Sequence, residues 1–552
     1  MSARRFAFCR LLETETPRFT CRKSRLEPLE HRQLMTAATA VPFGHAMDES
    51  ALIGRDWDPR ERIPAPRPPV LTSFPNAAAT VYLDFNGHHE DQWGSYQDVD
   101  TPVFDIDGNP WSFGAAEVAR IEEIWRRVAE DFAPFNVNVT TVEPLVLAAG
   151  ADSSAANGTA LRVAIGGSSY DWYGHAAGGV GYVDSFTNPV SNVVYVFPQQ
   201  LSHNSRYIAE AVSHESGHAF GLNHHHVYDE DGNQTAEYDP GTFERAPIMG
   251  VSYYADRGTW GRGRVASVRI PFFDRVFYVV QDDMEVIARN ENGFGYRPDD
   301  HGEGFQSATP MNVISGSTAG TGQRSWTRVY ASGIIATNED RDFMSFHNPY
   351  DSAEVSLRVD VADVGANLDA KIELWRSFLL QPRHGGEPQL GYELVATADP
   401  DDDLGATITT QLQAGRYWVV VASHGTYGDV GQFTVTGTLV DQATPPIYTL
   451  DTLNAVRNGF GEPGGEGDIN GDGSVNLDDL NLVGNRFGQI LVADSQQAVI
   501  PPDSVSAYQS PWARSSRGAK SRLSVAAVDE VLAGRDEPLD RLLPFGFAGW
   551  RA

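Results

Sequence analysis

One stretch decides the interpretation of this chain: His214-Glu215-Ser216-Gly217-His218-Ala219-Phe220-Gly221-Leu222-Asn223-His224. Residues four apart share one face of a helix, so His214 and His218 present two imidazoles to one point. Neutral imidazole binds zinc at about 2.0–2.1 Å. Gly221 lets the chain leave the helix, because glycine tolerates positive φ, and the turn returns His224 as a third ligand. Three protein ligands leave a position open for water, which is typical of catalytic zinc.

Glu215 lies between the two helical histidines and supplies the remaining chemistry. Zinc lowers the pKa of bound water to about 7, so a neighbouring carboxylate can accept its proton near neutral pH. The activated water attacks a carbonyl, and the protonated carboxyl returns the proton to the leaving amine. The pattern therefore predicts amide hydrolysis with Glu215 as the general base.

These eleven residues resemble the extended zinc signature of the metzincin metallopeptidases, and Ala246-Pro247-Ile248-Met249-Gly250 lies where that family has its Met-turn. The resemblance implies zinc ligands His214, His218 and His224, with Met249 beneath the metal. Some metzincins have a zinc-binding tyrosine two residues after this methionine, whereas here the position is Val251, and Tyr253 and Tyr254 lie further on. The resemblance also implies an α+β catalytic domain, over residues 76–297, whose edge strand binds the peptide substrate by strand addition. We expect residues 178–186 to supply or flank that edge.

Bulk composition limits the other possibilities. A chain of 552 residues is long enough for several domains. Its formal net charge of -31 argues against nucleic-acid or anionic-membrane binding by the chain as a whole. The only cysteines, Cys9 and Cys21, are near the N-terminus, so no disulfide framework supports the body. No apolar run of about 18 residues occurs, so no transmembrane segment is predicted.

The N-terminal residues are basic, and Ser24-Arg25-Leu26-Glu27-Pro28-Leu29-Glu30-His31-Arg32-Gln33-Leu34-Met35 resembles the LEPR-type motif of large exported or surface proteins in one bacterial phylum. The resemblance implies a targeting segment over residues 1–45 and a secreted or cell-surface bacterial protein; a disordered basic tail is the alternative. Residues 46–75, rich in proline, are predicted to be a linker or propeptide.

Hydrophobic periodicity predicts the elements of the catalytic region. Alternation predicts strands near residues 81–85, 137–139, 161–165 and 193–197, and the spacing of apolar residues predicts a helix over 118–132 that Pro134 ends. Asp107-Gly108 between apolar residues predicts a hairpin over 103–113. Asn204 or Ser205 can cap the zinc-motif helix. An apolar run at 276–280 and a helix-like segment at 282–288 follow. Four further histidines are interpreted as exposed polar residues: His175, His203, His225 and His226.

Residues 298–440 predict a second, all-β domain, because short alternating segments are separated by Gly, Asp and Asn turns in the pattern of a β-sandwich. Several segments resemble the bacterial pre-peptidase C-terminal domain: Asp299-Asp300-His301-Gly302, Asp340-Arg341-Asp342-Phe343, Asn367-Leu368-Asp369-Ala370, Leu412-Gln413-Ala414-Gly415-Arg416-Tyr417 and Gly431-Gln432-Phe433-Thr434-Val435. The resemblance implies a domain that accompanies secreted peptidases and in some cases binds substrate or calcium. A plain accessory sandwich is the alternative.

Residues 445–490 predict a small α-helical calcium module. An EF-hand-like loop has Asp468, Asn470, Asp472, Ser474, Asn476 and Asp479 at its ligand positions, and Gly473 at its turn. Aspartate at the last position resembles the dockerin type I loop. The segments 453–461 and 480–488 repeat one another, which suggests a duplicated unit that has lost one loop. A cohesin-like or cell-surface partner is possible for such a module, and calcium-dependent folding is expected. Residues 491–552 are predicted to be a mostly disordered tail.

The sequence thus predicts a multidomain protein whose leading function is zinc-dependent cleavage of extracellular proteins or peptides, with Zn²⁺ and Ca²⁺ as cofactors. One alternative is a surface binding or scaffold protein with an inert peptidase domain; the intact Glu215 and complete ligand set weigh against it. A second alternative is a zinc hydrolase that cleaves a non-peptide amide.

Overall fold

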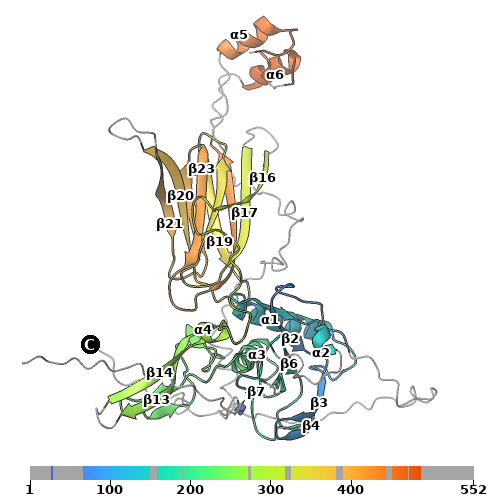
Figure 1. The fold of residues 1–552 in the computed structure, drawn as a ribbon. Coiled ribbons are helices and arrows are strands. Elements are labelled where there is room, and N and C mark those ends of the chain that lie inside the picture. The colour runs from blue at the N-terminus through green and yellow to red at the C-terminus, as the bar shows by residue number, and fades with distance from the viewer. Residues whose placement is uncertain are drawn as a thin grey trace, which may run out of the picture. The chain divides into compact units, whose positions relative to one another are not determined.

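The computed structural model describes residues 26–28, 66–148, 158–188, 191–270, 275–317, 325–380, 389–442, 450–465, 467–469 and 472–486 (Figure 1). Most of the predicted targeting segment, the linker up to residue 65 and the predicted tail lie outside the described residues. The described chain is multidomain and mostly β-sheet, with few helices. None of its helices combines the length and apolar character needed to cross a membrane.

A six-stranded sheet is the centre of the N-terminal region, which consists of residues 66–297 together with the short strand at residues 26–28. Its order is β1-β7-β8-β6-β2-β5. The strands are β1 (Leu26–Pro28), β2 (Ala79–Asp84), β5 (Val137–Thr140), β6 (Ala160–Ile165), β7 (Gly179–Tyr182) and β8 (Val193–Val196). The four strands β8, β6, β2 and β5 pair in parallel, whereas β7 is antiparallel to β8 and β1 is antiparallel to β7. The strands predicted near 81–85, 137–139, 161–165 and 193–197 are therefore confirmed.

Two long helices pack against this sheet and against each other: α1 (Ala115–Asp131) and α3 (Ser205–Ala219). A short helix, α2 (Leu145–Ala148), lies beside β6. The predicted apolar stripe of α1 is confirmed, since Ile121, Ile124 and Val128 are fully buried. Burial of such stripes, worth about 1.5–3 kcal/mol for each large side chain, holds the two helices to the sheet.

The hairpin predicted at residues 103–113 is wrong. The hairpin lies just before it, formed by β3 (His88–Trp93) and β4 (Tyr96–Thr101). Residues 103–113 are a loop because the Asp105 carboxylate accepts hydrogen bonds from the backbone N–H groups of Asp107, Gly108 and Asn109, at 3.0, 2.7 and 3.2 Å. These N–H groups are then not available for strand pairing, which is how aspartate favours turns.

Short strands and a two-stranded ribbon complete the N-terminal region after α3 (Figure 1). The elements are β9 (Val227–Tyr228), β10 (Gln234–Ala236), β11 (Arg245–Pro247), β12 (Arg257–Thr259), β13 (Arg262–Ile270), β14 (Arg275–Asp282) and α4 (Asp283–Ile287). Strands β11 and β12 are parallel, and β13 and β14 form the antiparallel ribbon. The predicted strand at 276–280 and helix at 282–288 are confirmed as β14 and α4.

The all-β accessory domain is confirmed as two five-stranded sheets, in the orders β15-β18-β23-β20-β21 and β16-β17-β24-β19-β22. Its strands are β15 (Thr309–Pro310), β16 (Asn312–Ser317), β17 (Ser325–Ile335), β18 (Arg341–Asn348), β19 (Ala353–Val361), β20 (Ala370–Leu380), β21 (Gln389–Ala398), β22 (Ala406–Leu412), β23 (Gly415–Ser423) and β24 (Gly431–Asp441). Alternate residues of β19, including Val355 and Leu357, are fully buried, as expected of a strand with one face toward a core.

Two helices follow the sandwich: α5 (Leu450–Gly459) and α6 (Leu477–Arg486). Val456, Val475 and Val483 form their small buried core. Val475 belongs to the predicted calcium loop between the helices. Its side chain therefore packs the loop against this core.

Candidate metal centre

Helix α3 delivers the histidine motif, and its two ends are fixed by the sequence. At the start, the Asn204 side chain accepts from the backbone N–H groups of Arg206 and Tyr207, at 3.0 and 3.3 Å, so Asn204 is the N-cap. At the end, Gly221 has a φ of +105°. The turn closes through hydrogen bonds from Gly221 N to the His218 carbonyl and from Leu222 N to the Gly217 carbonyl, both 2.9 Å. This glycine turn reverses the chain toward the helix.

The turn brings three imidazoles together. Ligand-type nitrogens of His214, His218 and His224 all lie within 4.8 Å of one another. The Nε2 atoms of His218 and His224 are 3.0 Å apart, close to the about 3.3 Å that separates two nitrogens bound to one tetrahedral zinc. The side chains are excluded from solvent, with exposed fractions of 2, 0 and 1%.

Hydrogen bonds to backbone carbonyls fix how these rings are oriented. Nδ1 of His214 donates to the Ile248 carbonyl at 2.7 Å, and Nδ1 of His218 donates to the Leu222 carbonyl at 2.8 Å. Since a carbonyl only accepts, both rings carry their proton on Nδ1 and keep the Nε2 lone pair for a metal. Nε2 of His214 is buried and has no hydrogen-bond partner among the described residues.

Burial and the neighbouring rings favour the neutral form of His214. Burial, followed by the neighbouring imidazoles of His218 and His224, lowers the pKa of His214 well below its usual value. A neutral imidazole with a buried, unused Nε2 is the form that binds zinc. The donor set therefore fits a zinc ion, and a ring of three nitrogens leaves room for a fourth ligand.

Glu215 lies against strand β7. It is fully buried. A Cβ atom on Gly179 of β7 would stand 2.6 Å from Glu215 Cγ and 2.7 Å from its Oε1, so the absence of a side chain at Gly179 makes the space that the carboxylate fills. The segment 178–186, predicted to supply or flank the peptide-binding edge, contains strand β7, and β1 pairs outside it, with Leu26 opposite Tyr182 and Pro28 opposite Val180.

Met249 lies directly under the motif helix. It is fully buried, and its sulfur would be 2.7 Å from a Cβ on Gly217, the residue before His218. Trp260 and Leu222 also face this glycine. Met249 therefore packs against the motif helix, and the closeness of this packing explains why residue 217 is small.

One prediction about the neighbouring histidines is wrong. His225 was expected to be exposed, but it is buried, and its Nε2 is 2.9 Å from Oδ1 of Asp283. The other carboxylate oxygen of Asp283 accepts from Gly261 N at 3.0 Å. Successive side chains point in different directions, so His225 turns away from the cluster, and a buried ring needs a polar partner. His203 and His226 are half-buried rather than exposed, and His175 is exposed as predicted.

Two tyrosines near the histidines were not identified as site residues. The ring centroid of Tyr238 is 4.5 Å from that of His224 and 6.3 Å from that of His214. The Tyr253 hydroxyl is buried without a hydrogen-bond partner among the described residues. Burial, followed by the charge of Glu215, raises the pKa of Tyr253 well above its usual value, so this hydroxyl keeps its proton at neutral pH. In the sequence, Val251 at the position where some metzincins have a zinc-binding tyrosine argued against a tyrosine role, although Tyr253 lies two residues further on.

The predicted calcium loop holds its carboxylates in another arrangement. Asp468 accepts from the backbone N–H groups of Asp472 and Gly473, at 3.1 and 2.9 Å, and Asp479 accepts from those of Ile469 and Asn476, at 2.8 and 2.9 Å. Asp472 accepts from Ser474, from both its backbone N–H and its hydroxyl. Asn470 lies outside the described residues. In the described part of the loop, the three aspartates do not gather their oxygens within 4.8 Å.

A second group of ligand-type side chains lies in the sandwich, in two segments that the sequence linked to the pre-peptidase resemblance without assigning them as metal ligands. Ligand atoms of Asp300, His301 and Asp342 lie within 4.8 Å of one another, and so do those of Asp299, Asp340 and Asp342. Asp342 is fully buried, and neither of its oxygens has a hydrogen-bond partner among the described residues; Oδ1 of Asp340 and Nδ1 of His301 are in the same situation. Burial, followed by the charges of Asp300 and Asp340, raises the pKa of Asp342 to about 9.

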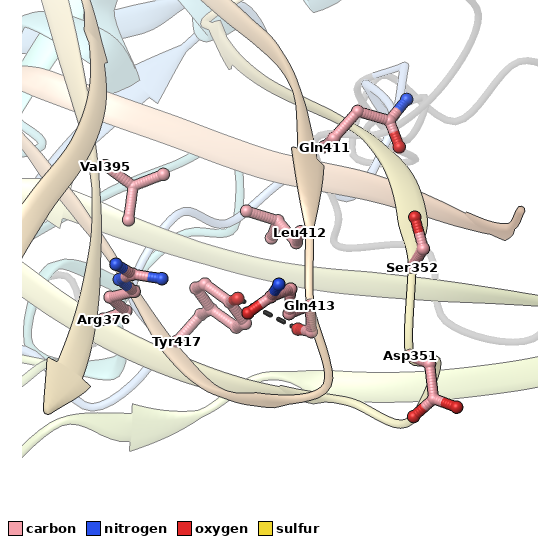
Figure 2. Close-up of a pocket in the computed structure, with 8 residues that line it drawn as sticks. All are labelled: Asp351, Ser352, Arg376, Val395, Gln411, Leu412, Gln413 and Tyr417. Atoms are coloured by element: carbon pink, nitrogen blue, oxygen red, sulfur yellow. Dashed lines mark hydrogen bonds between the residues drawn. The ribbon is translucent and has the colours of Figure 1, made fainter.

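A cavity of about 570 Å³ in the sandwich lies apart from both clusters (Figure 2). Its charged lining residues are Arg376 and Asp351, and its Tyr417 hydroxyl donates to the Gln413 carbonyl at 2.9 Å. The lining has no paired carboxylates, histidine or cysteine, so its side chains suit binding rather than catalysis. The remaining lining residues are Ser352, Val395, Gln411 and Leu412.

Comparisons with known proteins find only weak similarity. No protein-family model matches the chain, and no curated protein matches it. A pre-peptidase C-terminal domain of a collagenase from Bacillus anthracis is similar at 12% identity and a TM-score of 0.14, covering 26% of this chain and 97% of that domain. The lysozyme inhibitor PliG from Aeromonas hydrophila is similar at 10% identity and a TM-score of 0.15, covering 24% and 95%. A family 11 carbohydrate-binding module from Clostridium thermocellum is similar at 9% identity and a TM-score of 0.11, covering 24% and 83%. Scores this low support no conclusion about family.

Proposed function

We propose that this chain is a secreted or cell-surface zinc endopeptidase of the metzincin type. The single observation that carries the proposal is the buried cluster of His214, His218 and His224, in which Nε2 of His214 has no partner among the described residues. A buried Nε2 of His214 without a hydrogen-bond partner among the described residues costs about 1–3 kcal/mol. A metal ion removes that cost.

The chemistry follows from the residues around the cluster. A zinc ion held by the three histidines would polarise the substrate carbonyl and make water acidic enough to lose a proton at neutral pH. Glu215, the neighbour of His214, accepts that proton and returns it to the leaving amine. Burial excludes bulk water from this exchange, which strengthens the electrostatic interactions inside the site. Tyr253, which keeps its hydroxyl proton, is a donor available to the negative charge that develops on the carbonyl oxygen.

Strand addition supplies a way to hold a peptide beside Glu215. Strand β7 contains Gly179, against which Glu215 packs, and β7 accepts a further antiparallel strand, as its pairing with β1 illustrates. A peptide in the position of β1 would run along the same strand that borders the carboxylate. Main-chain hydrogen bonds of this kind give affinity without strong dependence on sequence.

Replacing the base tests the proposal. We expect wild-type protein to cleave a denatured protein substrate, and Glu215→Gln to lose at least about 10³-fold in kcat, in line with loss of a general base, while retaining zinc. Glu237→Gln is the matched control: Oε1 of Glu237 is 3.6 Å from Nδ1 of His224, so it is near the cluster without touching the reacting atoms. It should lose about 10- to 100-fold, the range for a residue beside a metal ligand, and so clearly less than Glu215→Gln.

The other outcomes separate the alternatives. Full activity of Glu215→Gln would contradict the assigned base. Wild-type protein that holds zinc but cleaves no protein would favour a non-peptide amide substrate, which substrate profiling identifies, or an inert scaffold. Zinc chelation should abolish any genuine activity, and restored zinc should recover it.

We also propose that the sandwich binds calcium at Asp342. Its buried oxygens, the free oxygen of Asp340 and the side chains of residues 299–301 form a mostly oxygen-lined site, which suits a hard cation. Calcium binding by the full chain should fall by one site in Asp342→Asn, measured by calorimetric titration; an unchanged number of sites would contradict the proposal. The loop 468–479 remains a proposed second calcium site, in a module that could engage a cohesin-like or cell-surface partner.

A further inference from the structure

The sandwich contacts the N-terminal region through buried polar groups rather than through a flexible tether. The loop that precedes β20 places Asn367 in the interface, and the loop that precedes β24 places Asp429 there; both residues are buried. Arg257 of β12 donates to the Asn367 carbonyl and to Asp429, both at 3.1 Å. Arg245 of β11 is 3.3 Å from the same carboxylate. Buried charges held by several donors fix geometry well, because few alternative arrangements satisfy them.

The sandwich loops reach the last turn of α1. Glu130 is fully buried and accepts from the Gln432 side-chain amide at 2.7 Å. Its neighbour Asp131, also buried, accepts from the Asn367 side-chain amide at 2.7 Å. Two acidic residues at the carboxyl end of a helix oppose the helix dipole. Burial, chiefly, raises the pKa of Glu130 to about 7. The sandwich thus donates hydrogen bonds to two buried carboxylates at the carboxyl end of α1, where the helix dipole disfavours negative charge.

Asp131 connects this interface to the histidine motif. Its second carboxylate oxygen accepts from the Ser213 hydroxyl at 2.5 Å, and Ser213 is the fully buried residue immediately before His214. The Asp131 carbonyl accepts from Trp260 Nε1 at 2.7 Å, and the Trp260 ring packs toward Gly217 of α3. One residue therefore touches the sandwich, the start of the motif and the tryptophan beneath it.

We propose that the sandwich positions the zinc-binding helix: Asn367 orients Asp131, and Asp131 holds Ser213, so that the backbone of His214 is fixed relative to His218 and His224. Asn367, Asp131 and Ser213 are positioning residues, since none touches substrate or metal. The proposal rests on the proposed zinc function. Under this proposal the sandwich helps to form the active centre, whereas a separate accessory domain would leave the zinc site unaffected.

The experiment compares Asn367→Ala with Gln432→Ala in the full chain. Each variant removes one side-chain donor to an acidic residue at the end of α1, but only Asn367 is connected to Ser213. We expect Asn367→Ala to weaken zinc binding and lower kcat by about tenfold each, the lower end for residues that orient metal ligands, with KM changed less than about twofold. The absorption spectrum of the cobalt-substituted protein, which reports ligand geometry, should shift in Asn367→Ala and stay unchanged in Gln432→Ala.

Ser213→Ala breaks the same connection from its other end and leaves the interface intact. It should reproduce the cobalt shift, and the double variant Asn367→Ala/Ser213→Ala should lose no more zinc affinity than the worse single variant, because both act through Asp131. Equal zinc affinity, spectrum and kcat in Asn367→Ala and Gln432→Ala would overturn this inference while leaving the zinc function intact. Wild-type protein without zinc or activity would overturn the proposed function, and this inference with it.

Discussion

The histidine cluster of α3 is fully buried, whereas the acidic cluster of the sandwich combines buried Asp340 and Asp342 with exposed Asp299 and Asp300, and the two differ in how they tolerate the absence of a metal. Burial favours the neutral form of His214, so its ring is uncharged in the arrangement that brings the three imidazoles together. Asp342 must either hold a proton or bear a charge next to Asp340 and Asp300. The comparison teaches that the first site is preformed, whereas the second depends on a cation or on pH for its stability.

Among changes that leave the three histidines and Glu215 in place, the largest effect should come from a substitution beside them. Gly179→Ala places a methyl group 2.6 Å from Glu215 Cγ, so the carboxylate must move. We expect kcat to fall by about 100-fold, in the range seen when a proton-transfer group is misplaced, with zinc retained.

Gly261→Ala is the control for that variant, because the nearest atom to its new methyl group would be at an ordinary 3.5 Å. Its kcat should stay within about twofold of wild type, as for a substitution that meets no close neighbour. If Gly179→Ala keeps full activity, the closeness of β7 to the base has no catalytic meaning.

The acidic cluster should show the opposite behaviour, a large effect on stability and none on chemistry. The pKa values of Asp342 and Asp340 in the folded protein, about 9 and about 6, lie above the usual 3.8. The folded protein therefore binds protons that the unfolded chain releases, and without calcium its free energy of unfolding should fall as pH rises from about 4 to about 9. Calcium at 100 times its Kd should restore about 2.7 kcal/mol.

Calorimetric melting at pH 5 and pH 8, with calcium or with a calcium-selective chelator, checks this expectation. Asp342→Asn should melt at a higher temperature than wild type at pH 8 without calcium, and calcium should not stabilise its sandwich. A wild-type stability that rises with pH in the chelator would contradict the assigned cluster.

The difference between the two clusters also explains what the sequence could and could not reveal. His214, His218 and His224 lie on one helix and its turn, so local geometry alone brings them together. Asp342 of β18 meets Asp299 and Asp300, which precede β15, only in the folded domain, and no local sequence pattern records that contact. His225 was misjudged for the same reason, since its partner Asp283 lies on α4, far along the chain.

The strands and helices themselves were largely predictable, because alternation and helical spacing are local. The exception at residues 103–113 shows the limit of such patterns. There, the Asp105 carboxylate accepts hydrogen bonds from backbone N–H groups that would pair the strands of a hairpin. Tyr253 could not be placed from the sequence, because its closeness to Glu215 depends on how the chain returns after Met249.

The loop 468–479 has the sequence pattern of a calcium site, but backbone N–H groups already donate hydrogen bonds to its carboxylates. Asp468 and Asp479 each accept two backbone N–H groups, so calcium must compete with these hydrogen bonds, of about 1 kcal/mol each. We expect calorimetric titration to show this site as weaker than the one at Asp342. Asp468→Ala should remove the weaker site only; loss of the tighter site instead would reverse the comparison.

The smallest effect should come from the strand next to the preformed site. Strand β1 occupies the pairing edge of β7 that a peptide substrate would use. Deleting residues 1–45 removes this intramolecular competitor, so KM should fall by about threefold with kcat unchanged, as for a weakly held local strand. Deleting residues 497–552 is the control and should change neither constant; a KM that rises on N-terminal deletion would show that the segment aids substrate binding.

Metal analysis of purified full-length protein tests the central claim most directly. The account predicts one zinc ion per chain in wild type and in Glu215→Gln, and none in His218→Ala. In wild type, Nε2 of His218 lies 3.0 Å from Nε2 of His224, so the substitution removes one of the converging nitrogens. Wild-type protein devoid of zinc, or a His218→Ala variant that keeps its zinc, would contradict it.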